Sequence, residues 1–393
     1  MTPAPPQART HLLSLDGIRG LAVLIVIIHN ATYILGPVTS LPLKIVSALA
    51  ATGWAGVQMF FVLSGFLITG ILVETRTKPQ YFRSFYIRRT LRIFPLYYGF
   101  LILVFVVAPP LVAIPDWTAQ VHANEGWYWS YLSNWSTAFG HGIPGLSHFW
   151  SLAVEEQFYV VWPLLVWALS VAGVLRVAVA LMLLAPLCRY LLHLLGLPQV
   201  ALYEFTISRM DALAAGAALA ILVRDPRWLG WITRRWRVLA AGSLLALVGF
   251  TVVNHGFQGD DLKVQVLGQT LLILACLSLL VAGLDLGRTE PSGISRVLQQ
   301  PVLRMLGKYS YAMYVFHFPI HTIASFYLTD AVNQGGTADR LARLAGYDLL
   351  IVVLSLGCAM LSWFLFEARI LALKDRWAPR PVSPLIPTPA ALP

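Results

Sequence analysis

Apolar stretches long enough to cross a lipid bilayer recur throughout this chain of 393 residues. An α-helix of roughly 20 apolar residues spans the hydrocarbon core of a membrane, and an apolar run of this length indicates a helix rather than a strand. We expect spans near residues 19–36, 45–73, 96–114, 152–170, 174–195, 211–223, 238–253, 265–284, 310–328 and 348–371. The sequence therefore predicts an all-α fold, a polytopic transmembrane helical bundle with about ten spans.

The composition argues against an ordinary soluble protein. Hydrophobic residues make up 58% of the chain, charged residues make up 12%, and the mean hydropathy is +0.71, whereas about a quarter of the residues of a soluble protein are charged. We expect one transmembrane domain at residues 11–373, between a disordered N-terminus at 1–10 and a Pro-rich cytoplasmic tail at 374–393.

The charge of the loops alternates in sign along the chain, and this alternation predicts how the chain is oriented in the membrane. The loop at 74–95 carries six Lys or Arg residues and the loop at 224–237 carries five Arg residues, whereas the loops at 115–148 and 254–264 are mainly acidic. Because Lys and Arg are enriched in cytoplasmic loops, we expect a multi-pass protein of the inner or plasma membrane with both termini cytoplasmic. The basic residues behind the net charge of +10 are confined to a few inter-span loops and tails, so membrane lipid, and no nucleic acid, is the expected partner.

His29 is an ionisable residue within an otherwise uncharged apolar run at 21–35. An ionisable group inside a transmembrane segment is costly and is usually functional. Arg19 stands at the cytosolic end of the same span, about 15 Å away along a helix. This arrangement predicts a reaction centre that is reached from the membrane interface.

A polar stripe opens the fourth span, where Ser151, Glu155 and Tyr159 follow at four-residue steps on one helix face and Glu156 lies beside them. Such a stripe either meets only lipid headgroups or faces an internal cavity. Two adjacent carboxylates within an apolar edge favour the cavity. Glu155 would then meet His29 near the membrane midplane, where a carboxylate fixes the tautomer of a histidine and strengthens it as a base.

Arg88, Arg89 and Arg92 precede the third span on the predicted cytosolic side. The enrichment of Lys and Arg in cytoplasmic loops explains a cluster of cations there, but it does not explain the use of Arg rather than Lys. The i, i+3 spacing of Arg89 and Arg92 lets two guanidinium groups bind one polyanion bidentately. We therefore expect this cluster to hold the phosphates of a cytosolic donor such as an acyl-coenzyme A.

Two other groups of polar residues allow more than one interpretation. Arg209 and Asp211, at the start of the sixth span, form either a structural ion pair or a wall of the cavity. His317 and His321 are four residues apart, as in some metal sites, but no nearby Glu or Cys completes a ligand set. We expect no metal and no permanently bound cofactor, with acyl-coenzyme A acting as a donor substrate.

Five segments carry a family resemblance. They are LDGIRG at 15–20 together with His29, RRTLRIFP at 88–95, SLAVEEQFY at 151–159, SRMD at 208–211 and LGKYSY at 306–311. In this order they resemble the membrane-bound acyltransferase family three. The resemblance implies transfer of an acyl group from cytosolic acyl-coenzyme A to a hydroxyl of a carbohydrate, an envelope glycan or a glycosylated natural product, often outside a bacterial membrane. It also implies an essential histidine and a preceding arginine, matched here by His29 and Arg19.

One spacing departs from the family pattern, because nine residues rather than ten separate Arg19 from His29. Ten positions turn an ideal helix by about 1000°, roughly 80° short of whole turns. Arg19 is therefore not expected to share a helix face with His29, unless Gly17 and Gly20 place it outside the regular helix.

These observations predict an integral membrane O-acyltransferase for acetyl or short-chain groups. His29 would act as general base on the acceptor hydroxyl, or as a transient acyl carrier, and Glu155 would orient it. Arg19 would neutralise charge near the thioester. Ser151 would align Glu155 or the acceptor, or carry the acyl group. The acceptor would contact Glu156, Tyr159, Arg209 and Asp211.

The competing interpretation is a proton-coupled secondary transporter, in which His29 and Glu155 form a proton relay. Transporters of that kind often have interrupted spans in matching halves, and the sequence has no such pair. The cytosolic arginine cluster also favours the enzyme.

Overall fold

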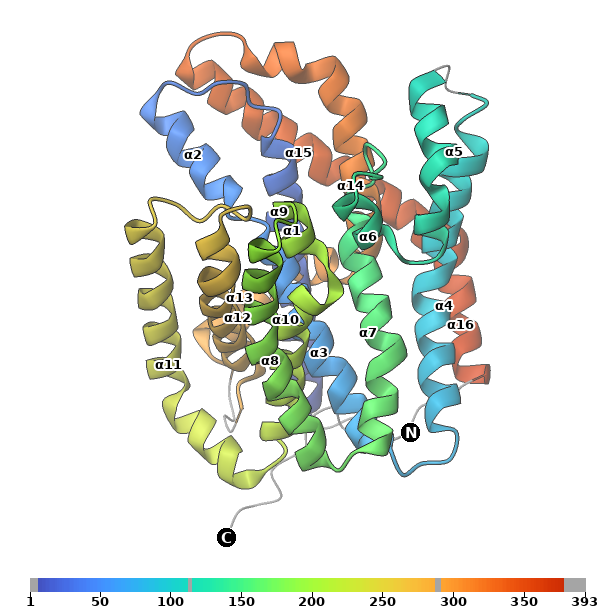
Figure 1. The fold of residues 1–393 in the computed structure, drawn as a ribbon, viewed down its shortest axis with the longest axis vertical. Coiled ribbons are helices and arrows are strands. Elements are labelled where there is room, and N and C mark those ends of the chain that lie inside the picture. The colour runs from blue at the N-terminus through green and yellow to red at the C-terminus, as the bar shows by residue number, and fades with distance from the viewer. Residues whose placement is uncertain (1–5, 112–114, 287–290, 378–393) are drawn as a thin grey trace.

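The computed structural model describes residues 6–111, 115–286 and 291–377, and all regular secondary structure in those ranges is helical (Figure 1). The helices are α1 (Pro6–Thr32), α2 (Leu41–Ala51), α3 (Ala55–Thr75), α4 (Tyr81–Ile102), α5 (Pro115–Trp129), α6 (Ser133–Ala138), α7 (Phe149–Ala168), α8 (Val171–Leu194), α9 (Gln199–Glu204), α10 (Thr206–Leu222), α11 (Pro226–Val253), α12 (Gln269–Leu284), α13 (Gly293–Leu298), α14 (Pro301–Asn333), α15 (Thr337–Ser362) and α16 (Ala368–Trp377). Three π-helical turns, η1 (Leu103–Val107), η2 (Val264–Gly268) and η3 (Trp363–Glu367), extend α4, precede α12 and join α15 to α16.

Eight helical stretches among the described residues are long and apolar enough to cross a membrane. They match the predicted spans except 152–170 and 310–328, which form α7 and α14. These two helices are less apolar because they carry buried or half-buried Glu and His side chains, yet they lie within the same bundle (Figure 1). The predicted polytopic helical bundle is therefore confirmed.

Two of these stretches are interrupted helices. The stretch Leu41–Thr75 breaks at residues 52–54, between α2 and α3. The stretch Gln199–Leu222 breaks at Phe205, where the backbone is extended with φ −61° and ψ 139°. The sixth span is therefore longer than the predicted 211–223, because the buried Glu204 and Arg209 hide its first part from a search for apolar runs.

The helical unit also extends beyond the predicted domain limits of 11 and 373. α1 begins at Pro6 and α16 ends at Trp377, so helix is present at 6–10 and at 374–377, while the predicted domain limits stay predictions. Proline is favoured in the first turn of a helix, and the last turns of α16 consist largely of good helix formers. The rest of the predicted terminal segments, 1–5 and 378–393, lies outside the described residues.

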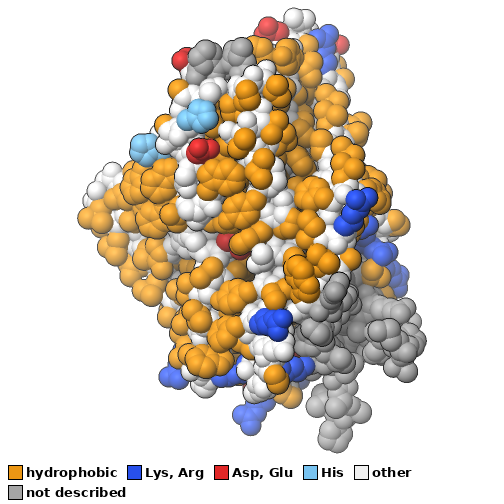
Figure 2. Space-filling view, turned by 90° about the vertical axis from the view of Figure 1, so that its right-hand side faces the viewer, with side chains coloured by type: hydrophobic (Ala, Val, Ile, Leu, Met, Phe, Trp, Pro, Cys, Tyr) orange, Lys and Arg blue, Asp and Glu red, His pale blue; other side chains and the backbone are white. Residues whose placement is uncertain are grey.

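The two ends of the bundle differ in charge. The connections 76–80 and 223–225 lie at the lower end in Figure 1, which we call the basic end, and 254–263 and the α14–α15 connection lie toward the opposite end. Figure 2 shows a broad hydrophobic surface between the ends, with most visible Lys and Arg toward the basic end and most Asp and Glu toward the opposite end. This arrangement agrees with the predicted alternation of loops.

Glycines bring the central helices into backbone contact. A Cβ atom on Gly307 of α14 would lie 1.8 Å from the carbonyl oxygen of Asp16 in α1, and a Cβ atom on Gly216 of α10 would lie 1.9 Å from that of Val62 in α3. Small residues allow such close approach between helices in lipid, where no hydrophobic effect drives them together. These contacts fix α1, α3 and α14, which surround the site described below.

Replacing Gly307 or Gly216 with Ala should destabilise the bundle, because the added methyl group would force two backbones apart at a cost of about 1–3 kcal/mol or more. The thermal midpoint of the detergent-solubilised protein is the measurement. Gly249→Ala in α11 is the control, since nothing lies within 4 Å of its Cβ position. Equal midpoints for all three variants would show that the close approach is not required.

The loop charges also predict that α5 and the start of α11 lie on opposite sides of the membrane. Topology reporters fused after Ala123 and after Arg234 should give opposite readings, with Arg234 cytoplasmic. A fusion after Lys78 is the control and should agree with Arg234. The same reading at Ala123 and Arg234 would contradict the orientation.

Candidate active site

A cavity of about 1070 Å³ lies among α1, α3, α4, α7 and α14. Along α3 its wall runs from Thr75 at the basic end to Val57, a distance of about 27 Å at the helical rise per residue. The side chains of Lys78 and Gln80, in the α3–α4 connection, also line it. The cavity therefore reaches from the basic end through most of the thickness of a bilayer core, which is about 30 Å.

The lining changes character along the cavity. Its charged residues lie near the basic end and in the middle, and they are Asp16, Arg19, Glu74, Lys78, Arg88, Arg89, Arg92, Glu155 and Glu156. Its deep end, farthest from the basic end, is uncharged and is formed by Val57, Phe60, Phe61, Ser151, Leu152 and Tyr314. A ligand with an anionic part and a small apolar end matches this division.

Four arginines from two helices meet at the cavity wall: Arg19 of α1 and Arg88, Arg89 and Arg92 of α4. Arg19 donates a hydrogen bond to Asp16 at 3.1 Å, and the guanidinium of Arg89 lies 4.7 Å from the ring centre of Tyr159. Arg19, Arg89 and Arg92 interact electrostatically through space. Arg92 is exposed, and part of the surface that it exposes is the cavity wall. The cluster is thus open to a ligand.

Glu155 and Glu156 lie in the same part of the cavity as the arginines. The Glu155 carboxylate accepts hydrogen bonds from Ser64 at 2.9 Å and from Tyr159 at 3.0 Å. Neither bond involves His29. The expectation that Glu155 orients His29 is therefore wrong for this conformation, because the carboxylate is held by its own helix and by α3.

His29 lies outside the cavity lining, at the break between α2 and α3. Its Nδ1 is 2.8 Å from the carbonyl oxygen of Ala50, and its Nε2 is 3.2 Å from the hydroxyl of Tyr33, which is 67% exposed. Since a carbonyl only accepts, Nδ1 carries the hydrogen, and the lone pair of Nε2 accepts a hydrogen bond from the Tyr33 hydroxyl. A backbone carbonyl thus takes the orienting role expected of Glu155, and it leaves His29 ready to accept a proton.

The predicted difference in helix face between Arg19 and His29 explains this separation. α1 is continuous from Pro6 to Thr32, so Arg19 is within the regular helix despite Gly17 and Gly20. Arg19 faces the cavity, whereas His29 faces α2 and lies beside Tyr33.

Ser151 is at the deep end of the cavity and makes no hydrogen bond with Glu155. Its hydroxyl is 2.6 Å from that of Tyr314, so one of the two donates to the other, and both lie within hydrogen-bond distance of the carbonyl oxygen of His148, at 3.2 and 3.1 Å. Tyr314 is a lining residue that sequence reasoning missed, although it lies just after the LGKYSY segment. Ser64 and Tyr33 were also missed, because a lone hydroxyl in an apolar helix gives no signal in sequence.

Arg209 and Asp211 do not form the expected ion pair, and neither lines the cavity. Asp211 instead accepts from Arg189 of α8 at 2.7 Å, with both side chains buried. Residues two apart in a helix point in nearly opposite directions. Arg209 therefore points elsewhere and lies among aromatic rings.

The histidines of α14 are held by hydrogen bonds. His317 contacts the Tyr314 carbonyl through Nδ1 at 2.7 Å and Asn30 through Nε2 at 3.0 Å, and His321 contacts the Tyr347 hydroxyl at 2.9 Å. No group of three or more potential metal ligands occurs within the described residues.

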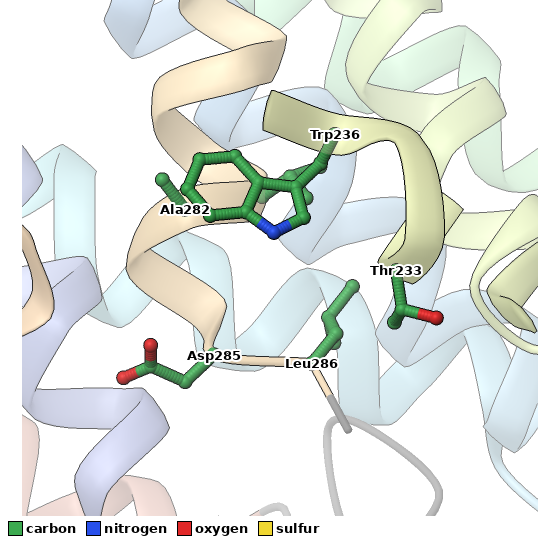
Figure 3. Close-up of a pocket in the computed structure, with 6 residues that line it drawn as sticks. Thr233, Trp236, Ala282, Asp285 and Leu286 are labelled. Carbon is green, nitrogen blue, oxygen red and sulfur yellow. The ribbon is translucent and has the colours of Figure 1, made fainter. Parts of the chain in front are cut away.

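A second, very small pocket lies between the ends of α11 and α12, where Figure 3 shows Thr233, Trp236 and Asp285 around it. Its volume of about 10 Å³ is at most that of a single water. It is therefore not a substrate site.

Comparison with known proteins gives the family. A family model described as an acyltransferase domain matches residues 12–367. The peptidoglycan O-acetyltransferase OatA of Listeria monocytogenes is 30% identical over 342 residues, and the putative peptidoglycan O-acetyltransferase YrhL of Bacillus subtilis is 29% identical over 354 residues. The O-acetyltransferase OatA of Staphylococcus aureus is 26% identical over 339 residues.

These matches cover 81% of this chain and 50–52% of the relatives, so the chain spans about half the length of the curated relatives that it matches. No solved structure matches the chain. The match to nearly the whole helical unit agrees with the resemblance seen in the five sequence segments. The chain belongs to the acyltransferase family that this membrane domain defines.

Proposed function

We propose that this protein is an integral membrane O-acyltransferase that uses acyl-coenzyme A as its donor. The donor enters the cavity from the basic end, on the cytosolic side, and the acyl group is transferred to a carbohydrate hydroxyl toward the opposite end. The observation that carries the proposal is the cavity itself, which joins an arginine cluster to an uncharged deep end. The relatives named as peptidoglycan O-acetyltransferases support an acetyl group and an envelope glycan as acceptor. A bacterial inner or plasma membrane, with both termini in the cytoplasm, fits this reaction.

The donor site uses both parts of the cavity, the charged part near the basic end and the uncharged deep end. Arg88, Arg89 and Arg92 hold the donor phosphates, because guanidinium groups bind phosphate oxygens bidentately. Arg19 of α1 lines the same part of the cavity and neutralises charge near the thioester. The acyl group then occupies the deep end, beside Phe60 and Leu152.

The acceptor site lies at His29. Its Nε2 lone pair accepts the hydroxyl proton of the acceptor while its Nδ1–H stays fixed on the Ala50 carbonyl. The exposed Tyr33 hydroxyl, 3.2 Å from Nε2, marks the position that an acceptor hydroxyl takes. Glu156 and Tyr159 lie in the cavity with the donor arginines, so we assign them to the donor side rather than to the acceptor.

The transporter interpretation loses its main support. It needs a proton relay between His29 and Glu155, but their hydrogen bonds lead to Ala50 and Tyr33 in one case and to Ser64 and Tyr159 in the other. The acyltransferase interpretation uses both groups of residues without joining them.

Changing Arg89 and Arg92 together to Lys should raise the KM for acyl-coenzyme A about tenfold or more and leave kcat nearly unchanged, because Lys keeps the charge but lacks the forked donors. Acyl transfer from labelled acetyl-coenzyme A in proteoliposomes measures both constants. Arg234→Lys with Arg235→Lys, on α11 and away from the cavity, is the matched control. An unchanged KM in the cavity variant would show that these arginines do not bind the donor and only help to set the orientation of the chain in the membrane.

His29→Gln should lower kcat by about 10²–10⁴-fold with unchanged donor KM, because Gln has similar volume but accepts no proton. Glu155→Gln should lose less, since that carboxylate does not contact His29. His321→Gln, a histidine held by Tyr347 outside the proposed site, is the control. Transfer near the wild-type rate by His29→Gln would remove the histidine from the mechanism.

A further inference from the structure

Arg209 of α10 is a fully buried cation, 0% exposed, that the chemistry above does not use. Its guanidinium carbon lies 4.4 Å from the ring centre of Tyr203, 5.2 Å from that of Trp150 and 5.6 Å from that of Phe61. None of its three nitrogen atoms makes a well-formed hydrogen bond within the described residues, and the Tyr203 hydroxyl is the one side-chain polar group that interacts with it at looser geometry.

The carboxylates that act on Arg209 through space do not hydrogen-bond to it. Asp211 is occupied by Arg189 and by the Ala212 backbone amide, and no hydrogen bond joins Glu204 to Arg209. A buried charge without a hydrogen-bonded counter-ion is costly, and aromatic rings offset only part of that cost. No carboxylate hydrogen-bonds to the N–H groups of Arg209, so these groups can bind an anion that reaches them.

Arg209 lies between the donor cavity and His29. On one side, Phe61 both contacts the guanidinium and lines the deep end of the cavity. On the other side, the Tyr203 ring is 6.0 Å from that of Trp54. Trp54 follows Gly53, where a Cβ atom would lie 2.6 Å from the Cβ of His29. Aromatic side chains thus form a layer between the two sites, with one cation inside it.

We propose that Arg209 binds the oxyanion that forms on the acyl carbonyl during transfer between the cavity and His29. This inference rests on the proposed function. The acceptor oxygen bonds to the thioester carbon, its proton goes to His29 Nε2, and the carbonyl oxygen becomes negative. The C–S bond then breaks, the carbonyl re-forms, and the thiolate takes a proton from water in the cavity. His29 returns its proton to water on its own side, which balances the hydroxide left in the cavity and restores the neutral base.

The surroundings of Arg209 suit this role. A forked cation in a water-excluded aromatic layer stabilises a developing oxyanion far more than it would in water. Phe61 is the ring shared by the guanidinium and the cavity, so it is the side chain that must move for the acyl group to reach Arg209. The bland alternative is that Arg209 only packs the interior, and the experiment below separates the two.

The experiment uses the purified full chain in proteoliposomes, labelled acetyl-coenzyme A and peptidoglycan fragments as the acceptor. Arg209→Gln should lower kcat about 10²–10³-fold, the loss typical of removing one oxyanion donor, with the donor KM unchanged within about twofold. Arg209→Lys keeps the buried charge and protects folding, but it lacks the fork, so kcat should fall about tenfold or more. The double variant Arg189→Met with Asp211→Leu removes a neighbouring buried arginine together with its partner, and it should keep kcat.

Each outcome decides between the possibilities. Wild-type kcat in folded Arg209→Lys, or an equal loss in the Arg189/Asp211 control, would overturn the role of Arg209 and leave the proposed function intact. A rise in donor KM with unchanged kcat would also overturn it, because a transition-state contact acts on kcat. Absence of transfer by the wild type would instead overturn the proposed function, and this inference with it.

Discussion

The high cost of placing charge in hydrocarbon governs the arrangement of this bundle. Most charged side chains near the centre of the bundle face the internal cavity or bind one another, as Arg189 and Asp211 do, whereas Arg209 lies among aromatic rings. The cavity in turn depends on the glycine contacts that hold α1 against α14 and α3 against α10. A wall of five helices can stay open around polar side chains because the neighbouring helix pairs are packed at backbone distance.

The sequence predicted the large features because they depend on composition over whole segments. Long apolar runs gave the spans, loop charges gave the two ends, and the helical angle between Arg19 and His29 placed them on different faces. Tertiary partners could not be predicted in the same way. His29 was expected to pair with Glu155, but the actual acceptor is a backbone carbonyl, and a backbone carbonyl at a helix break has no signature in side-chain pattern.

The candidate site residues form two separate groups, although the sequence motifs predicted one site in which Glu155 meets His29. The arginines, Glu155 and Glu156 line the cavity that opens at the basic end, and His29 lies beyond an aromatic layer, toward the opposite end. Arg209 and Asp211 also differ from the prediction, because they neither pair with each other nor line the cavity. Asp211 contributes to the packing of α8 against α10, whereas Arg209 lies in the layer itself. Two residues of one short motif thus serve separate purposes because the helix points them apart.

The break between α2 and α3 has a consequence for the chemistry proposed for His29. In an uninterrupted helix the carbonyl oxygen of Ala50 would be bound by the amide of Trp54, on the axis of the helix. Here the chain turns at residues 52–54, the Gly53 amide approaches that oxygen from one side at 2.9 Å, and the second lone pair accepts from His29. The imidazole is thus oriented by a peptide group that carries no titratable proton. Under the proposed function, the tautomer of the base is therefore set by a backbone group and not by a carboxylate whose protonation changes with pH.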